Sequence, residues 1–172
     1  MTGFTVRRFG ADDWRAFREI RLRMLADTPI AYGETHAAAA VLGDDIWRLR
    51  AARNEEPGNI GLAAIDADGT WLGVMRGFVD AARGPMLVGV FVDPAARGAQ
   101  AGVADALLDG IIAWAAERAD TLTLHVHAEN PRAIAFYERR GFRDTGERLD
   151  YELPPYGIEY EMRLAIGRDS QA

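Results

Sequence analysis

A seven-residue apolar run, Met86–Val92, is the feature that most narrows the folds open to this 172-residue chain. Its side chains are apolar on both faces of the strand it would form, which is typical of a central strand in a sheet. Gly84-Pro85 leads into the run, and Gly102–Arg118 follows it as a helical segment with an apolar stripe. A buried strand followed by an amphipathic helix predicts an α/β fold.

Patterns on either side of this run complete the expected order of elements. Asp68-Gly69 lies between two β-rich stretches and is typical of a hairpin turn. Helical spacing with start and stop signals predicts helices from Asp12 to Thr28, between Thr35 and Arg53, over Gly102–Arg118 and over Pro131–Arg140. Strands are predicted at Phe4–Phe9, Ile60–Asp66, Trp71–Val79, Met86–Val92, Thr121–Ala128, Phe142–Asp150 and Ile158–Ala165. The order βααβββαβαββ describes an α/β fold of the α+β type, with a mixed, mostly antiparallel sheet flanked by helices.

Composition excludes several classes of protein. The chain has no cysteine, which rules out disulfides, thiolate metal sites and cysteine nucleophiles and makes the cytoplasm the expected compartment. No apolar run is long enough to span a bilayer, so no membrane partner is expected. The formal net charge of −6 argues against nucleic acid as a partner. Lysine is also absent, which excludes Schiff-base chemistry and a P-loop lysine.

The domain organisation is expected to be simple. No repeat, low-complexity tract or linker interrupts the chain, and its length suits one domain with a sizeable core. We therefore expect a single domain over residues 1–167, followed by a polar tail over residues 168–172.

A first chemical motif runs from Val90 to Ala104, through a loop of small residues between a strand and a helix. The first turn of a helix presents unpaired N–H groups and a partial positive charge, and both favour a phosphate. Gly98 and Gly102 would let the backbone approach such an anion, and Arg97 would add a bidentate contact. An ordinary strand-to-helix loop that happens to contain glycine explains the same residues.

A second motif runs from Asn130 to Phe142. Asn130 suits a helix N-cap, Pro131 the first helical position and Gly141 the position just past the end. Capping does not explain the adjacent Phe136 and Tyr137. A core tyrosine with its hydroxyl at the edge of the protein is the alternative explanation for Tyr137.

Taken together, the two motifs resemble the acyl-CoA-binding and C-terminal motifs of the GNAT (Gcn5-related N-acetyltransferase) superfamily. The signature N-x-x-A-x-x-F-Y-x-x-x-G-F is matched in full, and the predicted element order matches the family fold. The resemblance implies direct transfer of an acetyl group from acetyl-CoA to a primary amine, with Tyr137 as the catalytic acid that protonates the departing thiolate. The cofactor-binding residues that it implies are Val90, Phe91, Val92, Arg97, Gly98, Gly102, Val103, Ala104, Asn130, Phe136 and Tyr137.

The phosphate loop departs from the family pattern. Gly102-Val103-Ala104 fits the second half of the usual glycine-rich loop and Arg97-Gly98-Ala99 fits the first half, but Gln100-Ala101 stand between them as if inserted. We therefore expect the N–H groups at the start of the helix to hold the phosphates and Arg97 to contribute less.

The acceptor side is less defined. Glu34, His127 and Glu129 are the candidates for the acceptor site or a general base, with His125 and Glu161 as further candidates for the base. His125 and His127 share a strand face, but with no cysteine and only His36 elsewhere we expect no metal site. A solvated carboxylate is the alternative for Glu34.

Two functions remain open from the sequence. The first is an N-acetyltransferase acting on a small-molecule amine, and the second is a non-catalytic acyl-CoA-binding or sensing module with the same fold. The resemblance also admits a homodimer.

Overall fold

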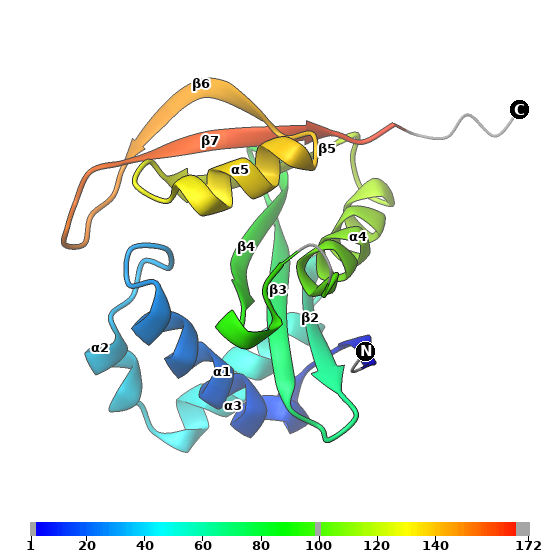
Figure 1. Ribbon diagram of the computed structural model, residues 1–172, viewed down its shortest axis with the longest axis vertical. Coiled ribbons are helices and arrows are strands. Elements are labelled where there is room, and N and C mark those ends of the chain that lie inside the picture. The colour runs from blue at the N-terminus through cyan, green and yellow to red at the C-terminus, as the bar shows by residue number, and fades with distance from the viewer. Residues whose placement is uncertain (1–2, 99–100, 168–172) are drawn as a thin grey trace, which may run out of the picture.

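The computed structural model describes residues 3–98 and 101–167 of the chain. Its strands form one seven-stranded sheet in the order β1-β2-β3-β4-β5-β7-β6 (Figure 1). All neighbours are antiparallel except β4 and β5, which run parallel, so the expected α/β class with a mixed, mostly antiparallel sheet is confirmed. The strands are β1 (Phe4–Arg8), β2 (Asn59–Asp66), β3 (Trp71–Asp80), β4 (Gly84–Val92), β5 (Thr121–His127), β6 (Arg143–Asp150) and β7 (Ile158–Ala165).

The helices differ from the prediction in one place. The single helix expected between Thr35 and Arg53 is instead two helices. The chain therefore has three helices between β1 and β2, and not the expected two. Gly43 is extended and starts a new helix, and Asp44 and Asp45 favour that start because acidic side chains stabilise a first helical turn. The helices are α1 (Trp14–Asp27), α2 (His36–Ala40), α3 (Asp44–Ala52), α4 (Val103–Ala116) and α5 (Pro131–Arg139), with short 3₁₀ turns at Ala11–Asp13, Arg53–Glu55 and Pro94–Ala96.

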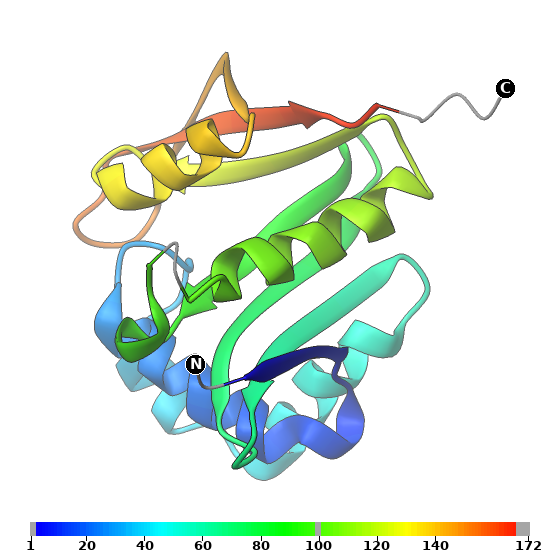
Figure 2. The ribbon, with the colours of Figure 1, turned by 45° about the vertical axis from the view of Figure 1, so that its right-hand side comes forward.

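Helices cover both faces of the sheet (Figures 1 and 2). On β2, Leu62 and Ala64 point to the face covered by α4, whereas Ala63 points to the face covered by α1 and α3. This alternation with a period of two residues produces two separate hydrophobic clusters, one on each face of the sheet. The continuous apolar character of the central strands follows from this double burial.

The last part of the chain forms one end of the sheet, with α5 as the layer that covers it. β5 pairs with β7 along its whole length, β7 pairs with β6, and α5 packs against these strands. Tyr137 and Phe142 join this layer to the cluster under α4. Within the described ranges, no helix is both long enough and apolar enough to cross a membrane.

We expect Leu107→Ala to lower the free energy of unfolding by about 2–5 kcal/mol, because it removes a fully buried side chain between α4 and the sheet. Urea unfolding followed by circular dichroism measures the change. Leu49→Ala is the matched control, since Leu49 is also helical but 51% exposed, and its effect should stay within about 0.5 kcal/mol. Equal losses in the two variants would contradict this account of the core.

Candidate active site

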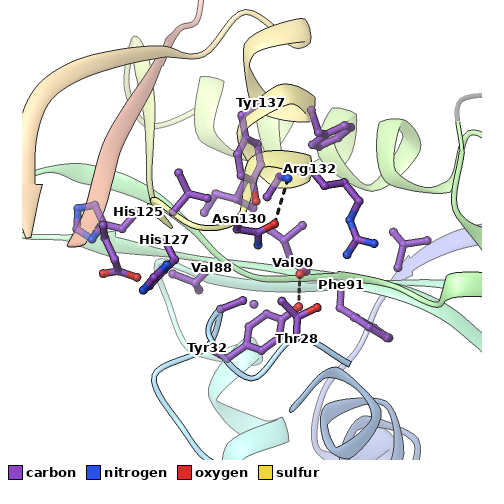
Figure 3. A pocket seen from close by; sticks show the side chains of 18 of the residues that line it. Thr28, Tyr32, Val88, Val90, Phe91, His125, His127, Asn130, Arg132 and Tyr137 are labelled. Atoms are coloured by element: carbon purple, nitrogen blue, oxygen red, sulfur yellow. Dashed lines mark hydrogen bonds between the residues drawn. The ribbon is translucent and has the colours of Figure 1, made fainter. Parts of the chain in front are cut away.

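A cavity of about 800 Å³ opens where β4 and β5 separate. The two strands pair only at Met86 with Thr123 and at Leu87 with Leu124. Beyond Leu87 a bulge bends β4, and Gly89 within it has φ +59°, a left-handed conformation that suits glycine. Figure 3 shows side chains from both strands, from α5 and from the segment after α1 converging on this space.

The edge of β4 that faces the cavity is the one carrying the backbone groups of Val90 and Val92. The carbonyl of Val90 accepts a hydrogen bond from the Tyr32 hydroxyl at 2.8 Å, and that of Val92 accepts one from Arg97 Nε at 2.8 Å. The next amide, that of Asp93, donates to Leu72 of β3 on the opposite edge. Because backbone groups alternate along a strand, Val90 and Val92 face the cavity whereas Phe91 faces β3 with its backbone.

Tyr137 enters the cavity from α5 (Figure 3). Its side chain is buried, with 6% exposed, and packs edge-on against Phe136 and Phe142. Burial raises the pKa of its phenol above the usual range, with a smaller contribution from Tyr32. No group in the described ranges hydrogen-bonds its hydroxyl. The hydroxyl therefore stays protonated at neutral pH and is free to donate to a ligand.

The helix that carries Tyr137 begins and ends as the sequence predicts. The Asn130 side chain accepts a hydrogen bond from the amide of Ala133 at 3.3 Å, and Gly141 follows the helix with φ +92°. Asn130 and Phe136 also line the cavity. Asn130 therefore both caps α5 and lines the cavity.

The start of α4 lies at one end of the cavity. Gly102 precedes the helix with φ +69°, and the first amide paired along the helix is that of Ala106, which donates to Gly102. The amides of Val103, Ala104 and Asp105 belong to the first turn and have no intrahelical acceptor. Ala104 and Asp105 line the cavity, whereas the Val103 side chain is buried in the core.

Arg140 connects this helix start to α5. Its guanidinium donates to the carboxylate of Asp105 at 2.7 Å and also pairs with Asp109. The negative charge of Asp105 at the start of α4 is thereby balanced by an arginine from the end of α5.

Arg97 and Gly98 line the cavity, but the Arg97 guanidinium is already engaged. It pairs with the carboxylate of Asp27 at the end of α1, and its Nε donates to Val92. Asp27 also lies 4.0 Å from the guanidinium of Arg132. Gln100 lies outside the described residues, so the inserted dipeptide Gln100-Ala101 is described only at Ala101, whose amide donates to Gly98.

Tyr32 is a cavity residue that sequence reasoning missed. It lies in the segment after α1, opposite Tyr137, and its hydroxyl reaches Val90 (Figure 3). Burial raises the pKa of Tyr32 to about 12, partly offset by Arg21. An aromatic residue beside a glycine is too common a pattern to single out a site.

His127 and Glu129 differ in their access to the cavity. His127 lines it, but Nε2 lies 2.8 Å from the Tyr156 carbonyl and Nδ1 accepts from the Glu129 amide at 3.1 Å. These contacts fit the tautomer protonated on Nε2 and leave neither ring nitrogen free. The Glu129 side chain is exposed and lies outside the cavity lining.

Two carboxylates have contrasting surroundings. Glu34 lies outside the main cavity, 3.1 Å from Arg21 and 2.8 Å from Arg50. Burial alone would raise the pKa of Glu34, but the two arginines outweigh burial, and the pKa of Glu34 is lowered. Glu159, which sequence reasoning also missed, is half-buried in the cavity wall. Burial raises the pKa of Glu159, and His125 and His127 reverse this only in part. Glu159 is thus the stronger proton acceptor of the two.

The remaining candidates, Glu161 and His125, lie close together, and His125 also lines the cavity. Glu161 is buried and pairs with Arg83 and Arg163, and it lies 3.5 Å from His125. In the part of the chain that the structure describes, no group of three or more His, Asp or Glu side chains is placed to hold a metal ion.

Comparison with known proteins agrees with this geometry. The profile of the acetyltransferase (GNAT) family matches residues 16–142. No curated protein sequence matches the chain.

Several solved structures share the fold. A GNAT-family acetyltransferase from Streptococcus pneumoniae superposes with a TM-score of 0.79 at 18% identity, covering 96% of this chain and 100% of that one. A GCN5-related N-acetyltransferase from Kribbella flavida gives 0.71 at 25% identity, covering 95% and 98%. A putative acetyltransferase from Salmonella typhimurium, solved with its cofactor acetyl-CoA, gives 0.76 at 18% identity, covering 99% and 98%. With the family match over most of its length, this chain belongs to the acetyltransferase (GNAT) family.

Proposed function

We propose that this protein is an N-acetyltransferase that moves an acetyl group from acetyl-CoA directly to a primary amine of a small molecule. The observation that carries the proposal is the unpaired Tyr137 hydroxyl in the cavity between β4 and β5. Family membership and the Salmonella structure with acetyl-CoA support the choice of donor. The absence of cysteine fits the cytoplasmic location expected from the sequence.

The donor is proposed to lie along the free edge of β4. The amides of Val90 and Val92 would bind the pantetheine arm as an added strand does. The diphosphate would sit at the first turn of α4, where the amides of Val103 and Ala104 point outward and the helix dipole favours negative charge. Arg132 and Arg139, both in the cavity lining, would add positive charge on the α5 side.

The transfer step needs no covalent enzyme intermediate. The neutral amine nitrogen attacks the thioester carbon, the C–S bond breaks, and the sulfur leaves as a thiolate that takes a proton from Tyr137. The proton lost by the amine nitrogen passes to Glu159, through water if the two do not touch. An amide of the β4 edge would stabilise the negative charge that develops on the carbonyl oxygen.

Tyr137→Phe tests the acid. Because general-acid catalysis is worth about 10²–10⁴-fold, and water partly replaces the phenol, we expect turnover to fall about 10²-fold. Affinity for CoA, measured by calorimetry, should be nearly unchanged. Tyr156→Phe is the matched control because it removes an exposed hydroxyl outside the cavity lining. Wild-type turnover in Tyr137→Phe, with chemistry rate-limiting, would reduce Tyr137 to a packing residue.

The same assay separates the enzyme from the alternative function. Thiol release from acetyl-CoA is followed with polyamines, amino acids, aminoglycosides and peptides as acceptors. Binding of acetyl-CoA without turnover across this panel would favour a non-catalytic acyl-CoA-binding module.

Gly102→Asp tests the phosphate end. We expect it to abolish most CoA binding, because a carboxylate would stand beside the amides that hold the diphosphate. Gly102→Asn is the matched control: it has the same shape and the same left-handed backbone strain without the charge, so it should bind CoA more tightly than Gly102→Asp. Calorimetric titration with CoA measures both variants, and equal affinities would mean that no phosphate lies there.

Arg97→Ala should weaken CoA binding only mildly, by less than the roughly 1.5–3 kcal/mol of a fully engaged charged hydrogen bond, because Arg97 already pairs with Asp27. If Arg97→Ala proves more damaging than Gly102→Asp, Arg97 is a primary phosphate ligand.

Glu159→Gln tests the proton acceptor. Glu159 must be ionised to accept a proton, and its pKa is raised by burial, so wild-type kcat/KM should fall as the pH drops through that raised pKa. The Gln variant should lose most activity and the acidic limb of the profile. Glu152→Gln, which changes an exposed carboxylate of the same cavity, should keep both. Coincident wild-type and Glu159→Gln profiles would exclude this role.

A further inference from the structure

A second cavity of about 360 Å³ lies beside the first and is lined by arginines. Arg21, Tyr32, Gly33 and Arg76 line both cavities, so the two are adjacent across these residues. Tyr32 forms the wall of the main cavity opposite Tyr137 (Figure 3). A molecule held in the second cavity would therefore extend toward the place where Tyr137 enters the first.

The charges around this second cavity are unbalanced. Four of its lining residues are arginines, named here the arginine cluster: Arg21, Arg50, Arg53 and Arg76. Among the residues that the structure describes, Glu34 is the only acidic one in the lining, which leaves an excess of three positive charges. Glu34 is already shared between Arg21 and Arg50.

Arg76 is the least compensated member of the cluster. Its Nε donates to the neutral side chain of Asn54 at 2.9 Å, and its guanidinium lies 5.5 Å from the ring centre of Phe17. Neither Arg76 nor Arg53 contacts a carboxylate within residues 3–98 and 101–167. Burial, together with the charges of Arg21, Arg50 and Arg53, lowers the pKa of Arg76 to about 10, so this guanidinium is held among like charges.

The arginine cluster lacks the negative charge that would compensate its positive charge. Removing a guanidinium from water is unfavourable unless a partner of opposite charge compensates it. The planar guanidinium is also the side chain best suited to bind carboxylate or phosphonate oxygens through two hydrogen bonds. A purely cationic acceptor, such as a polyamine, would instead be repelled.

We propose that the arginine cluster binds the anionic group of the acceptor, so that the substrate is a small primary amine that also carries a carboxylate or a phosphonate. This inference rests on the proposed acetyltransferase function and names its substrate class. The anion would lie among Arg50, Arg53 and Arg76, with the amine directed past Tyr32 into the main cavity. The positive charge nearby would also favour the neutral, nucleophilic form of the amine.

The activity test compares amines that carry an anionic group with amines that lack one. L-α-amino acids, their carboxamides, the matching aminoalkylphosphonates and spermidine are assayed for thiol release from acetyl-CoA. We expect kcat/KM to fall about 10- to 150-fold from acid to carboxamide, as for loss of a charge-assisted hydrogen bond. The ratio of carboxylate to phosphonate activity identifies the preferred anion. Equal activity with carboxamides or spermidine would overturn the proposal while leaving the acetyltransferase function intact.

Variants locate the anion. Arg76→Gln and Arg53→Gln should each raise KM for the anionic acceptor about 10-fold or more and leave KM for acetyl-CoA unchanged. Arg53 is exposed, so its variant tests the cluster even if Arg76→Gln fails to fold. Arg18→Gln is the matched control, because it removes an arginine charge from α1 one turn before Arg21 and outside both cavities. A rise in KM for acetyl-CoA instead would assign the cluster to the donor.

A binding assay keeps the proposal testable without turnover. The melting temperature of the CoA-saturated protein is measured with the same amino acids and aminoalkylphosphonates. We expect an increase that Arg76→Gln and Arg53→Gln abolish and Arg18→Gln retains. Binding without acetyl transfer would defeat the proposed function alone, whereas the absence of any anion-dependent increase would defeat the arginine-cluster proposal.

Discussion

β4 and β5 are hydrogen-bonded over only two residue pairs, although both strands continue well beyond Leu87 and Leu124. The cavity between them exists because this pairing stops. An unpaired strand edge normally attracts another chain, and here the Tyr32 hydroxyl and Arg97 Nε occupy its carbonyls. An aromatic residue and an arginine therefore cover part of the edge that β5 leaves unpaired.

Local chemistry explains why much of this structure could be predicted from the sequence. The caps at Asn130 and Gly141, the turn at Asp68-Gly69 and the apolar stripe of α4 each depend on a few adjacent residues, and all are present. The split between α2 and α3 was missed because helical spacing continues across Gly43. The glycine interrupts the helix only through its extended backbone.

Features that depend on contacts between distant parts of the chain were harder to predict from the sequence. Which backbone groups of β4 face the cavity depends on its register with β3, so the sequence could not distinguish Val90 from Phe91. Arg21, Arg53 and Arg76 come from α1, a 3₁₀ turn and β3, and no spacing rule connects them. Net charge carries no information about such a cluster, since a chain of charge −6 still gathers arginines around one cavity. The net charge of a protein affects its binding of large polyanions, whereas the binding of a small anion depends on the few charged groups around it.

Arg140 connects the two helices that border the cavity, α4 and α5. Its guanidinium joins the end of α5 to Asp105 and Asp109 of α4, and it lies three residues after Tyr137. The first turn of α4 and the tyrosine hydroxyl are therefore parts of one braced unit rather than independent groups on separate helices. A displacement of α4 relative to α5 would therefore have to stretch or break these ion pairs.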